Sequence, residues 1–252
     1  MSVKFEHDHP PLAEGKSGCF SRVSLIDVCA KEGSMVFWII GAGKFGSRAV
    51  RFLTKEYPEA RITLVDSDRY ALADWQGRVA TVWDDGVTFL VRQLNETEAR
   101  TVPDWIVPAI PVHVAFEWLR HTLAKRFDIT SVPVPDAFGS LLPHPVRGSK
   151  GELYVSHATF MCPEDCPEPP DVCMATGEPR KTDVYKMLEQ TIFAEHTSVV
   201  VRSRQLAPGV GGYPAQALLN ARVKVSRSEG RVLMGTACRC HGVVHAFRIV
   251  KN

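Results

Sequence analysis

The sequence lacks long apolar runs and lacks an excess of charge of either sign. No stretch approaches the ~20 apolar residues that a membrane-spanning helix needs, so we expect no membrane insertion. The 30 basic and 28 acidic residues leave a net charge of +2, which gives no reason to expect nucleic acid as a partner. The N-terminus also lacks the charged and then apolar order of a secretory signal. These absences favour a cytoplasmic protein, whose seven cysteines are thiols or metal ligands rather than disulfides.

Motifs of several common enzyme classes are missing as well. The chain has no HExxH pair, no Walker lysine and no Ser, His and Asp in a hydrolase order. It also has no internal repeat and no low-complexity tract. The sequence therefore argues against metalloprotease, kinase-type and hydrolase functions.

Strand and helix patterns alternate along the first half of the chain. Short apolar runs indicate buried strands, and apolar residues at intervals of three and four indicate amphipathic helices. Strands are expected at residues 36–40, 61–66, 78–82 and 104–111, and helices at 44–56, 69–76, 86–96 and 113–127. This alternation is typical of parallel strands joined by helical crossovers. The sequence therefore predicts an α/β protein with a Rossmann-type parallel sheet.

The segments on either side of this region have a different composition. Residues 1–34 mix proline, glycine, histidine and charge without a period, so we expect a loosely ordered leader. Prolines punctuate the chain after residue 127, and a smaller cysteine-containing α/β segment is expected over residues 128–252. In that segment residues 183–195 form a helix pattern, residues 208–223 a glycine turn that opens a helix, and residues 231–250 two strands around a turn. The predicted organisation is a leader (1–34), an α/β domain (35–127) and a cysteine-rich segment (128–252).

A glycine loop, GAGKFG, joins the first expected strand to the first expected helix. In such a loop the first glycine permits a tight turn, the second lets the backbone approach a pyrophosphate, and the third lets the helix pack on the sheet. The free N–H groups of the helix then face the phosphates. About 20 residues further on, an aspartate at the end of the second strand is placed to accept ribose hydroxyls. The predicted cofactor-binding residues are Gly41, Gly43, Lys44, Phe45, Gly46 and Asp66.

The carboxylate of Asp66 favours NAD(H) over NADP(H), because it would repel a 2′-phosphate. The competing interpretation is a domain of the same shape that has lost its ligand. The sequence therefore predicts a dinucleotide site and leaves this alternative open.

Three segments resemble a known nucleotide-binding domain. The stretches WIIGAGKFGSRAVRFL, ITLVDSD and ATVWDDGVTFL are similar to the N-terminal domain of Trk-type potassium-uptake regulators, the TrkA-N or RCK domain. The resemblance covers residues 36–110. It implies NAD(H) binding by the glycine loop and Asp66, and it adds Asp84 or Asp85 as a further cofactor contact. The second half of the chain does not resemble the C-terminal ligand-binding module of that family.

Five of the seven cysteines lie in the second half of the chain, in a C-x3-C-x6-C loop and a C-x-C-H turn. Prolines follow the first two, as in loops that wrap an iron–sulfur cluster. Four thiolates suit an iron–sulfur cluster, whereas three or four thiolates with a histidine suit tetrahedral zinc. Thiols without a metal, and disulfides, are the competing interpretations. The sequence predicts a metal centre, iron–sulfur ahead of zinc, with the ligands Cys162, Cys166, Cys173, Cys238, Cys240 and His241.

His113 is the candidate acid/base residue. It follows the fourth expected strand, at the carboxyl edge where open α/β sheets bind ligands, although a helix-start role competes. The sequence thus predicts an NAD(H)-binding redox protein with a cysteine-ligated metal centre and a small-molecule substrate or electron acceptor. An NAD(H)-responsive regulator of a transporter or other partner, and an NAD-binding enzyme with structural zinc, remain open. A homodimer is a further open alternative.

Overall fold

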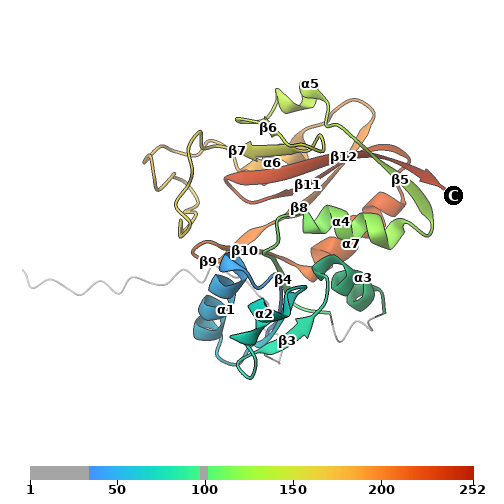
Figure 1. Ribbon diagram of the computed structural model, residues 1–252. Helices are drawn as coiled ribbons and strands as arrows, with labels where there is room; N and C mark the ends of the chain where they lie inside the picture. The colour runs from blue at the N-terminus through green and yellow to red at the C-terminus, as the bar shows by residue number, and fades with distance from the viewer. Residues whose placement is uncertain (1–33, 97–101) are drawn as a thin grey trace, which may run out of the picture. The chain divides into compact units, whose positions relative to one another are not determined.

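Two mixed β-sheets form the framework of the described residues, 34–96 and 102–252, in the computed structural model (Figure 1). These residues belong to one unit, Gly33–Asn252. The predicted leader, residues 1–34, lies outside the described residues except for Ser34. Helices and strands alternate as expected, so the α/β class is confirmed. None of the helices in the described ranges is long and apolar enough to cross a membrane.

The first sheet has the strand order β3-β2-β1-β4-β10-β9; neighbouring strands from β3 to β4 pair in parallel, and β10 pairs antiparallel with both β4 and β9. In register, Val36 of β1 lies beside Arg61 of β2, and Phe37 of β1 lies beside Trp105 of β4. The sheet comprises β1 (Val36–Ile40), β2 (Arg61–Asp66), β3 (Ala80–Trp83), β4 (Trp105–Pro108), β9 (Arg204–Ala207) and β10 (Val210–Pro214). The first sheet is therefore mixed rather than wholly parallel, because β10 runs antiparallel to both β4 and β9, and a Rossmann-type sheet stays a prediction.

Strand β10 lies where the sequence predicts a glycine turn. Its two glycines give no alternating apolar pattern, so the sequence does not indicate a strand. The pairing with β4 is antiparallel, with Tyr213 opposite Ile106. A Cβ atom on Gly212 would lie 2.9 Å from the Ile106 carbonyl oxygen, so this glycine permits the close approach of the two strands. Tertiary pairing, rather than local pattern, makes this segment a strand.

Two helices of the first half have the predicted bounds, 44–56 and 86–96, and the two predicted at 69–76 and 113–127 are shorter than predicted. They are α1 (Lys44–Glu56), α2 (Arg69–Ala73), α3 (Gly86–Glu96) and α4 (Val114–Leu123). Helix α4 was expected to reach residue 127, but Phe127 begins β5 (Phe127–Val132), which pairs with β12. The aromatic and β-branched residues of β5 are compatible with a strand, and the partner strand decides the boundary.

The second sheet contains the strand order β6-β7-β12-β11-β8, and β5 also pairs with β12. Its strands are β5, β6 (Val146–Arg147), β7 (Leu153–Ser156), β8 (His196–Arg202), β11 (Gly230–Ala237) and β12 (His241–Lys251). The last two strands form an antiparallel hairpin around residues 238–240, so the two strands predicted around a turn are confirmed.

Helices α4 and α7 (Ala215–Ser226) contact each other and join the two sheets. Helix α4 contacts β11, and α7 contacts both β8 and β10 (Figure 1). One buried cluster accordingly includes Ile106, Trp118, Leu218 and Phe247. A second cluster packs α5 (Asp136–Gly139) and α6 (Val184–Gln190) against the second sheet. The predicted division at residue 127 stays a prediction, and strands from beyond it complete the first sheet.

Candidate functional site

The glycine loop lies between β1 and α1, and two of its glycines are required by packing. Gly41 donates its N–H to the Val65 carbonyl (2.7 Å) and has a φ of +108°, a backbone conformation that residues other than glycine rarely adopt. A Cβ on Gly46 would lie 1.8 Å from the Gly41 carbonyl oxygen. These contacts fit the roles expected of the first and third glycines, the tight turn and the close packing of helix on strand.

Gly43 is different, because none of the described residues requires a glycine there. Its φ is −64°, which any residue adopts, and no atom of the described residues lies within 4 Å of the position that its Cβ would take. Gly43 is exposed, as are the neighbouring Lys44 and Phe45. It is also the N-cap of α1 and offers no side chain to cap the helix. The space beside Gly43 is therefore open to a ligand.

Asp66 ends β2 and turns its carboxylate toward the glycine loop. One oxygen accepts a hydrogen bond from the Ala42 N–H (2.6 Å), and the other accepts from the Asp68 N–H (2.7 Å). The carboxylate thus lies against the loop on which the sequence predicts a dinucleotide. This is the position from which a carboxylate reaches a ribose in a dinucleotide-binding domain.

Asp84 and Asp85 both have local partners at the start of α3. Asp84 pairs with Arg92 (Oδ2 to Nη2, 2.8 Å), and its N–H donates to the Asp66 carbonyl. Asp85 caps the helix by accepting from the Thr88 N–H (2.8 Å). Each aspartate therefore has a structural role, and the cofactor contact implied by the resemblance stays a prediction.

The structure brings the five late cysteines and His241 to one pocket of about 240 Å³. His241 lies between two of the sulfurs: its Nε2 is 3.4 Å from Cys162 Sγ, and its Nδ1 is 3.9 Å from Cys238 Sγ. All five thiols are free and half-buried. Residues that are up to 79 positions apart in sequence thus share one cavity.

The pocket shifts the thiol pKa values in both directions: hydrogen bonds with Thr176 lower the pKa of Cys173, whereas three other thiols have raised pKa values. Burial raises the pKa of Cys162 and Cys238, and it raises the pKa of Cys240 to about 11. The N–H groups of Cys240 and His241 point at Cys238 Sγ, at 3.4 and 3.3 Å. As they stand, no three His, Cys, Asp or Glu side chains among the described residues are grouped so as to hold a metal ion.

A buried arginine holds the cysteine loop, residues 162–173, in place. Arg180 is 4% exposed and donates to the carbonyls of Pro169 (2.7 Å) and Pro170 (2.8 Å). It also lies 4.0 Å from Asp183, a buried acid at the start of α6. These bonds satisfy loop carbonyls that have no partner in a helix or sheet, so the loop has a defined course.

The cysteine loop also contacts the helix of the glycine loop. Glu164, between Cys162 and Cys166, pairs with Lys44 (2.5 Å) and Arg48 (3.2 Å) of α1. Gln205 of β9 donates to the Cys166 carbonyl (2.5 Å). The two predicted sites, far apart in sequence, are therefore neighbours.

His113 caps α4 without a side-chain cap bond, and both of its ring nitrogens have partners. Nδ1 lies 2.9 Å from Nδ1 of His245, and Nε2 lies 2.8 Å from Thr236 Oγ1. Burial, followed by the nearby His245 ring, lowers the pKa of His113 to about 3. Such a ring is a weak base at neutral pH. The acid/base role stays a prediction, while the geometry gives His113 a structural role between α4 and the second sheet.

This pair predicts an acid sensitivity of the fold. Folding requires neutral rings at His113 and His245, whose pKa values are lowered, so the unfolded chain binds more protons between pH 6.5 and about 3. The free energy of unfolding should therefore fall as the pH drops from 7 to 5, by about 1–2 kcal/mol for His113. His113→Gln should flatten this dependence in urea unfolding at pH 7 and pH 5. His121→Gln, an exposed histidine on the same helix, should leave it unchanged.

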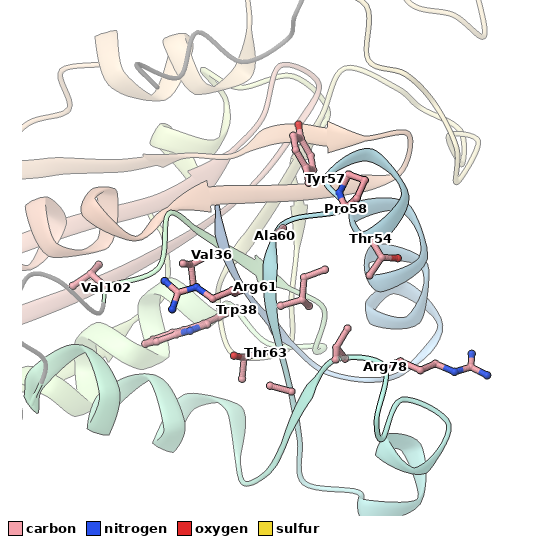
Figure 2. A pocket seen from close by; sticks show the side chains of 13 residues that line it. Val36, Trp38, Thr54, Tyr57, Pro58, Ala60, Arg61, Thr63, Arg78 and Val102 are labelled. Atoms are coloured by element: carbon pink, nitrogen blue, oxygen red, sulfur yellow. The ribbon is translucent and has the colours of Figure 1, made fainter. Parts of the chain in front are cut away.

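A further hollow, of about 580 Å³, lies near the amino ends of β1 and β2 (Figure 2). Thr54, Tyr57 and Pro58 line it from the end of α1 and the turn that follows, and Arg61 and Thr63 line it from β2. None of the described residues that line it is a Cys, His, Asp or Glu. It therefore offers neither metal ligands nor a carboxylate or imidazole base, and it lies at the opposite end of β1 from the glycine loop.

Comparison with known proteins places the chain in a family. Residues 115–250 match a family model described as "Uncharacterized protein, C-terminal domain" (AF_1314_C). The chain belongs to the AF_1314_C family. An "Uncharacterized protein" of Archaeoglobus fulgidus is 30% identical over 221 residues, which cover 83% of this chain and 98% of the relative. No solved structure matches the chain.

The AF_1314_C match includes the cysteine loop and the C-x-C-H turn, but it begins after the glycine loop. The TrkA-N resemblance, which covers residues 36–110, therefore stays a prediction.

Three residues of this AF_1314_C chain that join the two sites are not indicated by any sequence motif. They are Arg48, Glu164 and Gln205. One weak signal exists: α1 begins with two cations on one face and has no acid in its first turn. Because the first turn of α1 has no acid of its own, an acidic residue from another part of the chain can pair with Lys44 and Arg48.

Proposed function

We propose that this chain binds NAD(H) at the glycine loop and works as a redox protein. The observation that carries the proposal is Gly43: the fold does not require a glycine there, yet a pyrophosphate could approach its backbone. The parallel order β3-β2-β1-β4 supports it, because this order is typical of the Rossmann nucleotide-binding half. The resemblance to the TrkA-N domain points the same way.

The cofactor preference follows from Asp66. Its carboxylate lies at the end of β2 against the glycine loop, where it would accept ribose hydroxyls and repel a 2′-phosphate. NADH is therefore the expected ligand rather than NADPH.

Asp66→Ser tests this preference. The variant removes the charge and keeps a short hydroxyl, so NADH binding should weaken by at least about tenfold while the discrimination against NADPH shrinks. Fluorescence titration with both nucleotides measures the two affinities. Equal NADH affinity of the variant and the wild type would contradict the assignment of Asp66 to the ribose.

The cysteine pocket is proposed to hold a metal centre beside the nucleotide. Six soft or imidazole donors share one cavity, and two backbone N–H groups point at Cys238 Sγ, as they do around metal-bound thiolates. An iron–sulfur cluster bound there would supply one-electron chemistry, whereas zinc would crosslink the loop and the turn. The chain's own contribution is to hold the loop through Arg180 and to bring it to α1 through Glu164.

A second candidate function is regulation, favoured by the contact between the two sites. Because Glu164 joins the cysteine loop to α1, binding of a ligand at one site can change the ligand affinity of the other. Steady hydride transfer from NADH to an acceptor would favour the enzyme. Tight NADH binding without turnover would favour the regulator.

A further inference from the structure

One glutamate fastens the cysteine loop to the helix of the glycine loop. The Glu164 carboxylate lies 2.5 Å from Lys44 Nζ and 3.2 Å from Arg48 Nη2, and its backbone carbonyl accepts from Arg48 Nη1 (2.6 Å). The hydrogen bond from Lys44, and the charges of both cations, lower the pKa of Glu164, so it is a carboxylate at neutral pH. The side chains of Lys44 and Glu164 are 65% and 46% exposed. Pairs this exposed are weak enough to be displaced by a competing anion.

The two cations that Glu164 holds lie at the end of α1 where the proposed pyrophosphate would lie. Lys44 is the first residue of the helix and Arg48 follows one turn later, so both project near the same end. The first turn contains no acidic residue, so Glu164 supplies the negative charge that a helix N-terminus attracts. A phosphate at this place would meet a like charge.

The cysteine loop also packs closely against the turn between β9 and β10. A Cβ on Gly209, in the turn between β9 and β10, would lie 1.8 Å from the Glu164 carbonyl oxygen. Gln205 of β9 holds the Cys166 carbonyl from the same hairpin. Loss of the Glu164 contacts would remove the link of the loop to α1 and leave the loop held by Gln205, by Arg180, by the Arg239 N–H that donates to Glu168, and by the contact of Cys162 with His241.

We propose that Glu164 is a displaceable counter-anion that couples nucleotide binding to the cysteine loop. A bound nucleotide phosphate pairs with Lys44 and Arg48 and so breaks their ion pairs with Glu164. The cysteine loop is then released from α1, and the cysteine pocket becomes less rigid. By linkage, whatever holds the loop closed weakens nucleotide binding by the same factor. This inference rests on the nucleotide site proposed above and names how that site is regulated.

Glu164→Gln in the full chain tests the coupling, with Asp165→Asn as a control that removes the same charge from the next residue. We expect Glu164→Gln to bind NADH about three- to tenfold more tightly than the wild type, and Asp165→Asn to bind it as the wild type does. In hydrogen exchange, NADH should speed exchange in residues 162–173 of the wild type. In Glu164→Gln the same segment should exchange fast without NADH and should not respond to it.

The outcomes separate the coupling from the nucleotide site itself. Equal NADH affinity in all three proteins would overturn the coupling and leave the nucleotide site standing. Slower exchange of the loop on NADH addition to the wild type would overturn it too. No NADH binding by any of the three proteins would overturn the nucleotide site, and the coupling with it.

Discussion

Gly43→Ser is expected to weaken nucleotide binding without destabilising the fold. Serine is a better N-cap than glycine, the backbone at this position is already extended, and its side chain would enter open space. The free energy of unfolding should therefore rise or stay level, within about 0.5 kcal/mol. The same side chain would occupy the approach of the pyrophosphate, so NADH affinity should fall by at least about tenfold. Urea unfolding and fluorescence titration measure the two effects.

Gly46→Ala is the matched comparison, because the fold itself demands that glycine. The new Cβ would lie 1.8 Å from the Gly41 carbonyl oxygen, a contact that cannot form unless the helix shifts away from the strand. We expect a loss of about 2–3 kcal/mol in the free energy of unfolding. If Gly43→Ser bound NADH as the wild type does, the open space at Gly43 would have no bearing on a nucleotide, and the main support of the proposal would be lost.

The second large effect is expected from the cysteine pocket. Protein purified without oxygen should contain metal, with acid-labile sulfide if the centre is an iron–sulfur cluster. Cys238→Ala should lower the bound metal more than about tenfold, because Cys238 receives two backbone N–H groups and lies beside His241. Removal of the metal by a chelator should lower the free energy of unfolding by about 3 kcal/mol when the metal had been present at 100 times its Kd.

Cys29→Ser is the control for this experiment. It removes one of the two cysteines of residues 1–34, outside the described residues, from a segment where the sequence predicts no ligand. Its metal content should equal that of the wild type. A wild-type protein free of iron, zinc and sulfide would exclude the metal centre, and the shared pocket would then be a set of thiols.

The glycine-loop site is easier to predict from the sequence than the cysteine site, for a physical reason. The strand, glycine loop and helix over residues 36–56 are predictable because each signal is local: an apolar run, glycines at fixed spacing, and a helical stripe. The cysteine site is only partly predictable. The sequence indicates six soft ligands, but no local rule states that residues 162 and 241 share a cavity.

Strand β10 and the end of α4 illustrate the opposite case. Residues 210–214 have the composition of a turn and become a strand because β4 presents an open edge to them. Helix α4 ends before residue 127 because β12 pairs with the residues that follow. In both places pairing between distant segments outweighs local preference, as it commonly does in sheets.

By itself, the sequence determined the α/β class, the glycine loop with its helix, and the acid at the end of β2. Those features depend on residues within a few positions of one another, whose backbone preferences and apolar periods act locally. Only the tertiary structure decided that the cysteine loop rests against α1, through a contact between residues 120 positions apart. Such a contact depends on how the sheets and helices pack, because no short-range preference links Lys44 to Glu164.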